Sequence, residues 1–389
     1  MPRIHCLNNI SAKGTDQLPA SYELVDALDQ ADGVLVRSAK LHDAEFPPSL
    51  LAIARAGAGV NNIPLDRCAE EGIVVFNTPG ANANAVKELV IAGMLLGSRG
   101  IVAGAQWCRD NANDPEIGKA AEKAKKAFAG CEILGKKLGV IGLGAIGALV
   151  ANAAIDLGMD VYGYDPFVSV DAAWRLSKDV HHVTDLDELC ATCDYLTIHV
   201  PAMPQTKGMI GADQIAKMRE GAVLLNFSRD SLVDEEALVA ALADGKVGRY
   251  ITDFATPAIM KVDPECAIVL PHLGASTEEA EENCAVMAVR EIVDFIENGN
   301  ITNSVNFPAV NLGPRRDYGQ RVTIAHENKP GVINAITEAI AAHGHNVANI
   351  LSKARGDYAY TIIDVDDTLG ADAFEKLNAR ESVLRARIL

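Results

Sequence analysis

Short apolar runs alternate with helix-forming stretches along most of the chain. In the first part, Gly33–Ser38 and Gly72–Asn77 have the pattern of strands that end at polar residues, and 64–71 between them is helical. A second alternating region runs from about residue 136 to 272. We expect its strands at 137–141, 160–164, 195–199, 222–226 and 267–270. Strands that alternate with helices predict parallel sheets with crossover connections, so the fold class is α/β.

Two long segments have a helical pattern. The first, Ala85–Ala105, is rich in Ala, Leu and Met, and helix formation is interrupted after it at Asn111–Pro115. We expect this helix to serve as a hinge and as a dimer element, and we interpret the Lys-rich stretch 119–126 as a solvated face. The second helix, Glu278–Glu297, begins after Ser276 with an N-cap and acidic first-turn residues.

The last part of the chain has the pattern of a small separate α/β module. Gly313-Pro314 lies in a predicted linker, 311–320, and the module occupies 321–389. We expect strands at 321–326, 346–354 and 358–364, helices at 331–343 and 371–377, and a final strand at 383–389.

Composition narrows the class of protein. The 389 residues are 49% hydrophobic and 22% charged, as in a soluble globular protein of two or three domains. A net charge of −17 argues against nucleic acid or an anionic membrane as a partner. No apolar run approaches about 18 residues, and the start of the chain lacks a signal-peptide pattern. Eight scattered cysteines then favour reduced thiols and a cytoplasmic location.

We expect no metal site. Cys190 and Cys193 have the spacing of a redox or zinc motif without a second pair, and are better interpreted as buried thiols at a strand. The histidine pairs His181-His182 and His343-Gly344-His345 have no carboxylate cluster at ligand spacing beside them. We interpret both pairs as surface residues.

A glycine motif predicts a dinucleotide site. Gly142, Gly144 and Gly147 follow the strand 137–141 and open a helix, where they permit a tight turn, a close approach to pyrophosphate and close helix–strand packing. The next strand ends in Asp165, 23 residues beyond Gly142, where a carboxylate accepts hydrogen bonds from a ribose and repels a 2′-phosphate. This favours NAD over NADP. The alternative is a glycine-rich turn with an incidental acid.

Three polar residues near strand ends are candidates for the reaction. Arg229 follows the strand 222–226, where a guanidinium suits a substrate carboxylate, although a surface pair with Asp230 is as plausible from sequence. Asp253 follows a short apolar run. His272 follows the strand 267–270 and can exchange protons near neutral pH, although a lone His is more often structural.

The whole chain resembles the NAD-dependent D-2-hydroxyacid dehydrogenase family with a C-terminal ACT domain. The matching segments are 55–62, 77–80, the glycine motif, 164–166, 226–229 and 271–277. The resemblance implies two Rossmann-like domains, a flavodoxin-like substrate domain and an NAD-binding domain, followed by a ferredoxin-like ACT domain. The substrate domain would be discontinuous, residues 1–96 and 280–310, with the NAD-binding domain at 97–279 and the active site in the cleft between them.

The resemblance also implies an activity and its residues. The activity is NAD-dependent oxidation of 3-phospho-D-glycerate to 3-phosphohydroxypyruvate, the first step of L-serine biosynthesis. Arg229 would hold the carboxylate and carbonyl, and His272 would be the acid/base. Cofactor contacts would come from Thr78, Gly142, Gly144, Ala145, Ile146, Gly147, Asp165, Val200, Phe227, Ser228, Asp253 and Gly274. The substrate-binding edge would include Arg55, Gly57, Asn82 and Asn84.

One segment departs from the family pattern. Members normally carry a Glu five residues after the Asp that Asp253 matches, and this Glu partners the catalytic His; here the residue is Ala258. The stretch from Asp253 to His272 is also shorter than usual, and Asp263 or Glu265 could substitute. We expect His272 to work without its usual carboxylate and with an altered pH profile.

Regulation and assembly are further implications of the resemblance. An ACT domain would bind L-serine through His326, Asn328 and Asn346, unless this copy serves dimerisation alone. The chain would form a homodimer or homotetramer. Two alternatives to the phosphoglycerate activity stay open: a dehydrogenase of another 2-hydroxy acid such as glycerate or lactate, and a non-catalytic NAD-sensing protein.

Overall fold

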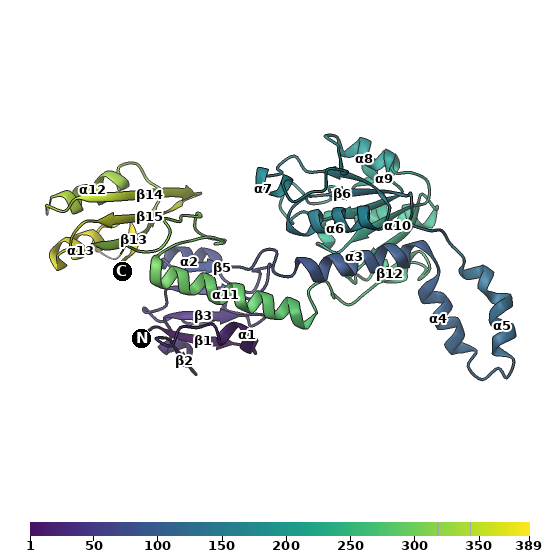
Figure 1. Ribbon diagram of the computed structural model, residues 1–389, viewed down its shortest axis with the longest axis horizontal. Coiled ribbons are helices and arrows are strands. Elements are labelled where there is room, and N and C mark those ends of the chain that lie inside the picture. Colours follow the sequence, from purple (N-terminus) through teal and green to yellow (C-terminus); the bar gives the residue numbers. More distant parts are fainter. Residues whose placement is uncertain (317–318, 343) are drawn as a thin grey trace. The chain divides into compact units, whose positions relative to one another are not determined.

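The chain folds into two compact units. The computed structural model describes residues 1–316, 319–342 and 344–389, so His343 of the predicted helix and residues 317 and 318 of the predicted linker lie outside the described residues. Unit 1 comprises Met1–Ala81 and Glu281–Leu389, and unit 2 comprises Asn82–Ala280. Figure 1 shows the ribbon of both units.

Unit 1 begins with a five-stranded parallel sheet of order β2-β1-β3-β4-β5, which is the flavodoxin-like order. Its strands are β1 (Arg3–Leu7), β2 (Glu23–Val25), β3 (Gly33–Val36), β4 (Ala52–Arg55) and β5 (Val74–Phe76). The helical segments of this part are α1 (Ala12–Thr15), η1 (Leu28–Gln30), α2 (Leu65–Glu70) and α11 (Glu278–Asn298), whose first turn belongs to unit 2. Alternate strand residues enter two cores, for example Leu35 on the α11 face and Val34 on the opposite face.

Unit 2 is built on a seven-stranded parallel sheet of order β12-β11-β10-β9-β6-β7-β8. Its strands are β6 (Lys137–Ile141), β7 (Asp160–Tyr164), β8 (His181–His182), β9 (Tyr195–Ile198), β10 (Ala222–Asn226), β11 (Val247–Thr252) and β12 (Ala267–Val269). Its helical segments are α3 (Ala83–Ser98), α6 (Ala145–Asp156), α7 (Val170–Ala173), α8 (Leu186–Thr192), α9 (Ala212–Lys217), η3 (Asp230–Leu232), α10 (Glu235–Ala243) and η4 (Ile259–Lys261). Strand order reverses beside β6, which is the doubly wound arrangement that creates a ligand crevice at the carboxyl ends of the strands.

Helix α3 packs against α6, β10 and β11 and so belongs to unit 2, whereas the resemblance places most of it in the substrate domain. Gly93 and Gly97 allow this packing, because a Cβ at either would lie within 3.0 Å of side chains of β10 or β11 or of Phe227. The predicted boundary near residue 97 therefore differs from the division by contacts, which falls at residue 82.

The predicted helix Ala85–Ala105 is wrong as a single element. Helix α3 ends at Ser98, and α4 (Ile101–Asp110) continues at an angle of 70°. Arg99 is extended, and the Gly100 N–H donates to Phe128 O on the returning chain. With α5 (Ile117–Ala124) and η2 (Lys125–Phe128), α4 forms a helical arm that projects from the sheet of unit 2 (Figure 1). None of the residues in α4, α5 and η2 is buried.

The C-terminal module is a four-stranded antiparallel sheet of order β14-β15-β13-β16 with two helices on one face. Its elements are β13 (Gln320–Glu327), α12 (Val332–Ala341), β14 (Val347–Arg355), β15 (Tyr358–Val365), α13 (Ala371–Asn378) and β16 (Val383–Ile388). Residues such as Val322 and Ile363 meet the helices, whereas Ala325, Tyr360 and Ile362 join the core that α11 covers. The predicted element order of this module is confirmed.

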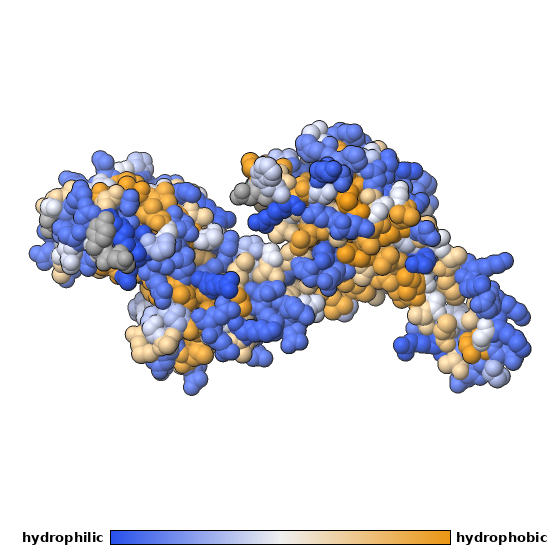
Figure 2. Space-filling view, in the orientation of Figure 1, coloured by the Kyte–Doolittle hydropathy of each residue, from blue (hydrophilic) through white to orange (hydrophobic). Residues whose placement is uncertain are grey.

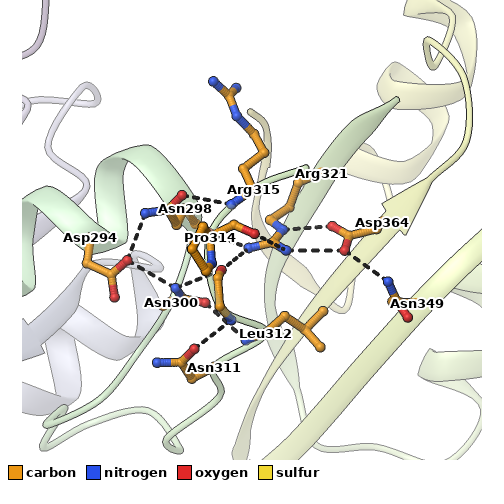
Figure 3. A network of polar contacts seen from close by, with 12 residues as sticks. Asp294, Asn298, Asn300, Asn311, Leu312, Pro314, Arg315, Arg321, Asn349 and Asp364 are labelled. Carbon is orange, nitrogen blue, oxygen red and sulfur yellow. Dashed lines mark hydrogen bonds and ion pairs between the residues drawn. The ribbon is translucent and has the colours of Figure 1, made fainter. Parts of the chain in front are cut away.

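A buried arginine joins this module to the rest of unit 1. Arg321 donates to both carboxylate oxygens of Asp364 at 2.7 and 3.1 Å, and their side chains are 1% and 5% exposed. The same guanidinium donates to Asn298 O at 2.9 Å and to Gly313 O at 2.8 Å (Figure 3). The segment between α11 and β13 is therefore held by side chains of the module itself.

Candidate active site

The carboxyl edge of the unit 2 sheet gathers the residues that the sequence pointed to. The glycine motif follows β6, Asp165 follows β7, and Val200 follows β9. Phe227 to Arg229 follow β10, Asp253 follows β11, and His272 follows β12. Because all these strands are parallel, one edge receives a phosphate-binding turn, a guanidinium, a carboxylate and an imidazole.

The glycine turn leaves room for a phosphate. Gly142 has a φ of +90°, and a Cβ there would lie 2.6 Å from His199 O. At Gly147 a Cβ would lie 1.8 Å from Gly142 O, so the start of α6 can approach the turn only without a side chain. At Gly144, by contrast, a Cβ would meet no atom within 4 Å. The open space therefore lies at the N-terminus of α6, where free N–H groups and the helix dipole favour an anion.

Asp165 fixes the shape of this turn. Its carboxylate oxygens accept hydrogen bonds from the backbone N–H groups of Leu143 and Phe167, both at 2.9 Å. Each carboxylate oxygen has a second lone pair, so Asp165 can still accept from a ribose hydroxyl. Ala145 is exposed, and Ile146 and Val200 are half-buried at the same edge.

His199, which the sequence analysis did not single out, lies below the turn. Its ring shares a hydrogen bond with Thr197 Oγ1 at 2.9 Å, and burial lowers its pKa to about 3. The imidazole is therefore neutral at physiological pH, and it places no positive charge beneath the glycine turn. Its position at the end of β9, two residues before Pro201, was the available signal in the sequence.

Asp253 is the one buried carboxylate at this edge among the described residues. It is 2% exposed, and one oxygen accepts the Gly274 N–H at 2.9 Å. Its other oxygen is buried and has no hydrogen-bond partner. A buried acceptor without a partner is costly, so it marks a place where a donor group of a ligand fits.

Residues 226–229 connect neighbouring strand ends. Ser228 Oγ donates to Ile198 O at 2.6 Å, and Phe227 is buried under α3. Arg229 is exposed, and its guanidinium donates to Ser228 O at 2.5 Å. In the described part of the chain no ion pair joins it to Asp230, whose carboxylate accepts the Ser231 N–H instead. The guanidinium of Arg229 therefore keeps donors available for a carboxylate.

His272 stands in a constrained backbone conformation. Its φ is +43°, in the left-handed region, and its N–H donates to Asp253 O at 2.9 Å. The imidazole is exposed, and its ring lies 5.0 Å from the ring of Phe254 at an angle of 62°. The backbone thus delivers the imidazole to the same edge as Asp253.

Neither substitute acid is found at His272. Asp263 accepts the Glu265 N–H at 2.8 Å, and its carbonyl accepts N–H groups at the start of β12. None of the hydrogen bonds and ion pairs among the described residues joins a carboxylate to the imidazole of His272.

In unit 1 the predicted residues Arg55, Gly57 and Thr78 form a tight group. Gly57 N–H donates to Thr78 Oγ1 at 2.7 Å, and Thr78 N–H donates to Gly57 O at 3.1 Å. Gly57 has a φ of +146°, and a Cβ there would lie 2.4 Å from Arg55 Nη1, so glycine is needed for the guanidinium to fold over it. Arg55 Nε donates to Arg37 O at 3.1 Å, and Thr78 is fully buried.

Asn82 and Asn84 belong to unit 2, at the start of α3. Asn82 is the N-cap residue but makes no side-chain cap hydrogen bond. The Asn84 amide donates to Glu88 at 2.8 Å and accepts from Lys87 at 2.6 Å.

The three predicted effector residues have different surroundings. His326 is 2% exposed; its ring nitrogens contact Glu327 O at 2.8 Å and Thr361 Oγ1 at 2.9 Å, and burial lowers its pKa. Asn328 and Asn346 are exposed, and their amides donate to Gly356 O and to Asp366.

Comparison with known proteins agrees with this geometry. Residues 91–274 match the family described as D-isomer specific 2-hydroxyacid dehydrogenase, NAD binding domain, and residues 321–382 match the ACT domain. The chain is 33% identical to D-3-phosphoglycerate dehydrogenase of Haemophilus influenzae, across 94% of this chain and 88% of that one. The chain belongs to the D-isomer specific 2-hydroxyacid dehydrogenase family.

Two further relatives of this 2-hydroxyacid dehydrogenase extend the comparison. The Escherichia coli D-3-phosphoglycerate dehydrogenase is 35% identical over 87% of this chain and 82% of its own length. The crystal structure of cofactor (NAD+) bound 3-phosphoglycerate dehydrogenase from Entamoeba histolytica superposes with a TM-score of 0.63 at 28% identity, covering 78% of this chain and 98% of that one. The predicted fold class, an NAD-binding Rossmann domain with a second α/β domain and a terminal ACT domain, is confirmed.

The residues of the family's NAD-binding segment fit the cofactor. Three features lie along one sheet edge: the open space at Gly144, the carboxylate of Asp165, which can accept further hydrogen bonds, and the unpartnered oxygen of Asp253. The described residues include no cluster of three or more His, Cys, Asp or Glu side chains that could hold a metal ion. Cys190 and Cys193 are buried free thiols, and burial raises the pKa of each to about 12.

A search for membrane-spanning helices covered the described residues. It finds no single helix that is long and apolar enough, and α3 with α4 qualifies only as a bent pair.

Proposed function

We propose that this 2-hydroxyacid dehydrogenase oxidises 3-phospho-D-glycerate to 3-phosphohydroxypyruvate in the cytoplasm, as the first step of L-serine biosynthesis. The observation that carries the proposal is the convergence of Arg229, Asp253 and His272 on one sheet edge, beside the turn at Gly144. The choice of substrate is supported by two D-3-phosphoglycerate dehydrogenases. They are 33% and 35% identical to this chain, over 94% and 87% of its length.

Each residue would have a distinct role. Bound NAD supplies the acceptor for the hydride that leaves C2 of the substrate. Arg229 binds the carboxylate of the hydroxy acid through two parallel N–H donors. His272 removes the hydroxyl proton, so that the C2–O bond becomes a carbonyl as the C2–H electron pair departs. Asp253 orients the cofactor through its unpartnered oxygen.

The phosphate and the remaining contacts would come from the predicted substrate group. Arg55, Gly57, Asn82 and Asn84 are the candidates, and Arg55 offers the positive charge that a doubly charged phosphate needs. The proposed cofactor contacts include the glycine motif and its acid, Gly142, Gly144, Gly147 and Asp165. They are completed by Thr78, Ala145, Ile146, Val200, Phe227, Ser228 and Gly274.

The direct test follows NADH formation at 340 nm, a standard wavelength for the assay, with 3-phosphoglycerate as substrate. Wild type should turn over, and His272→Ala should lose turnover by at least about a hundredfold while it still binds NAD. Glycerate and lactate run in parallel decide the substrate, because Arg55→Ala should raise KM for the phosphorylated acid and leave KM for glycerate unchanged. NAD binding without turnover on any of the three acids would instead indicate an NAD-sensing protein.

We also propose that the ACT domain binds L-serine near His326, Asn328 and Asn346. The exposed amides of Asn328 and Asn346 supply donors and acceptors of the kind that an amino acid needs. Isothermal titration with L-serine should show binding that Asn346→Ala abolishes. Equal binding in wild type and variant would contradict the assignment.

The helical arm of unit 2 supports a homo-oligomer. Ile101 and Val102 are 45% and 48% exposed, and Trp107 contacts only the arm's own Phe128 among the described ring contacts. Figure 2 shows apolar surface along α3 and on the arm. A second copy of the chain would cover this surface. Light scattering should give at least a dimer, and a double substitution Ile101→Asp with Val102→Asp should lower the mass to that of one chain.

A further inference from the structure

The imidazole of His272 needs a partner that fixes its orientation, because one side chain at the end of a loop has two free torsions. A catalytic base works only when its nitrogen stays within hydrogen-bond reach of the substrate proton. Among the described contacts, the ring has no hydrogen-bond partner, and the group that contacts it is the ring of Phe254.

Hydrogen bonds fix the backbone at both Phe254 and His272. Phe254 N–H donates to Thr252 Oγ1 at 3.2 Å, and Thr252 Oγ1 donates to Asn226 O at 2.8 Å. His272 N–H donates to Asp253 O at 2.9 Å, and the left-handed φ of +43° turns the chain there. The two rings are therefore brought together by strand ends that are themselves hydrogen-bonded.

The contact has the geometry of a favourable aromatic pair. The ring centroids lie 5.0 Å apart and the planes meet at 62°, which is an edge-to-face arrangement. A protonated imidazole would be attracted as well where its edge meets the face of the phenyl ring.

The acidic groups of this region are directed elsewhere. Asp253 accepts the Gly274 N–H, and Asp230 accepts the Ser231 N–H. The Glu235 carboxylate accepts the Thr256 hydroxyl, on the small cavity that Phe254 also lines. Arg229 donates to Ser228 O. Among the described residues, none of these carboxylates is hydrogen-bonded to the imidazole of His272.

We propose that Phe254 is the positioning residue of His272, and that an aromatic contact rather than a carboxylate orients the base in this enzyme. The inference rests on the proposed function, since His272 is the base only if the chain is a dehydrogenase. It extends that function by assigning a role to a side chain that the sequence pattern left unassigned.

The test compares Phe254→Leu, which keeps an apolar side chain without a ring, with Phe254→Tyr, which keeps the ring. Phe254→Leu should lower kcat for 3-phosphoglycerate about tenfold and leave the KM values for substrate and NAD within about twofold. The acid limb of kcat against pH should move down by about 0.5 pH unit, because the imidazolium loses its aromatic neighbour. Phe254→Tyr should restore both values.

Two further variants exclude a general effect of losing an aromatic ring and a failure of Phe254→Leu to fold. Phe46→Leu removes an aromatic ring in unit 1 that stacks under Arg67, and should leave kcat and the pH profile unchanged. Phe254→Met serves as a second ring-free variant if Phe254→Leu does not fold. A wild-type kcat and acid limb in the folded ring-free variant would overturn the proposal.

A measurement without turnover separates this proposal from the proposed function. The ring protons of His272 in wild-type NMR spectra should carry a ring-current shift that disappears in Phe254→Leu and remains in Phe254→Tyr. If the wild type lacks dehydrogenase activity, the proposed function fails, whereas the ring-current shift still reports the contact. An unchanged shift in Phe254→Leu would overturn the positioning role whatever the activity.

Discussion

Several residues have a buried polar side-chain atom that makes no hydrogen bond within the described part of the chain. One oxygen of Asp253, one ring nitrogen of His199 and one oxygen of Glu291 are buried without a hydrogen-bond partner. Asp253 and His199 stand at the edge where NAD would bind, so ligand binding would change their surroundings. Glu291 lies on α11 in unit 1, where its other oxygen accepts the Asn303 amide at 2.5 Å.

Glu291 should make the stability of unit 1 depend on pH. Burial raises its pKa from 4.5 to about 7, so the folded chain holds this proton more tightly than the unfolded chain. The stability contribution is fully present below pH 4.5 and falls as pH rises to about 7, by roughly 3 kcal/mol. Glu291→Gln stays neutral and keeps the acceptor for Asn303. We expect it to raise the urea midpoint at pH 8 and to remove this pH dependence.

The control for Glu291 is Glu279→Gln on the exposed side of the same helix. It should leave the pH dependence of the wild type intact. A Glu291→Gln midpoint at or below that of the wild type at pH 8 would show that the buried carboxylate is not a destabilising charge.

At the scale of elements, two glycines in the turn between β6 and α6 have different roles, one in packing and one beside the ligand space. Gly147 is needed for packing, since a Cβ there would collide with Gly142 O at 1.8 Å. Gly144 borders open space and has a φ of −70°, which any residue adopts. The spacing of the two glycines identifies the motif, but it does not tell which glycine is needed for packing and which borders the ligand space.

The pair of substitutions Gly144→Ala and Gly147→Ala should therefore behave differently. Gly147→Ala should cost at least about 2 kcal/mol of stability, because helix and strand must move apart. Gly144→Ala should leave the melting temperature within about 2 °C of wild type and weaken NAD binding about tenfold or more, since the methyl group fills the phosphate space. Calorimetry and NADH fluorescence titration check the two effects. Equal losses of stability in both variants would refute this division of roles.

The bend between α3 and α4 shows what element-scale prediction misses. Apolar residues resume directly after Ser98-Arg99-Gly100, at Ile101 and Val102, so periodicity alone extends the helix to Ala105. Gly100 was a stop signal, but its effect depends on Phe128, which returns 28 residues later to bind the Gly100 N–H. A contact between distant segments thus decided a local boundary.

At the scale of the whole chain, the ACT domain is anchored within unit 1 and is not merely tethered by a linker. Arg387 donates to Phe295 O at 2.8 Å and stacks 4.3 Å from the Phe295 ring, and Tyr360 donates to Gly299 O at 2.9 Å. Together with the pair of Arg321 and Asp364, these contacts tie the module to the end of α11. The module therefore packs directly on the part of unit 1 that contains the end of α11.

Removing one partner of the buried pair should loosen this attachment. Asp364→Asn leaves the Arg321 guanidinium buried without its counter-charge, at a cost of about 3 kcal/mol or more. We expect a lower unfolding temperature for unit 1 and faster proteolysis at the arginines near residue 315, measured by calorimetry and limited trypsin digestion. Arg315→Lys is the matched control, because it keeps a trypsin site and this exposed side chain points away from Arg321 (Figure 3). Equal digestion of wild type and Asp364→Asn would contradict the anchoring role.

The sequence by itself determined the fold class, the ACT module and the family, and it pointed to NAD. These depend on local patterns: alternating strands and helices, the spacing of Gly142, Gly144, Gly147 and Asp165, and polar residues directly after strands. Parallel strands carry such residues to one edge whatever the details of packing, so His272, Asp253 and Arg229 could be chosen before their positions were known.

Only the tertiary structure decided which groups meet. The ring of Phe254 beside His272, the bend at Gly100, the buried charge of Glu291 and the pair of Arg321 with Asp364 each depend on contacts between distant segments. Spacing along the chain carries no information on the distance between such groups, because strand order and helix packing set it. The imidazole of His272 is the clearest case, since no spacing in the sequence pointed to Phe254, whose ring lies beside it.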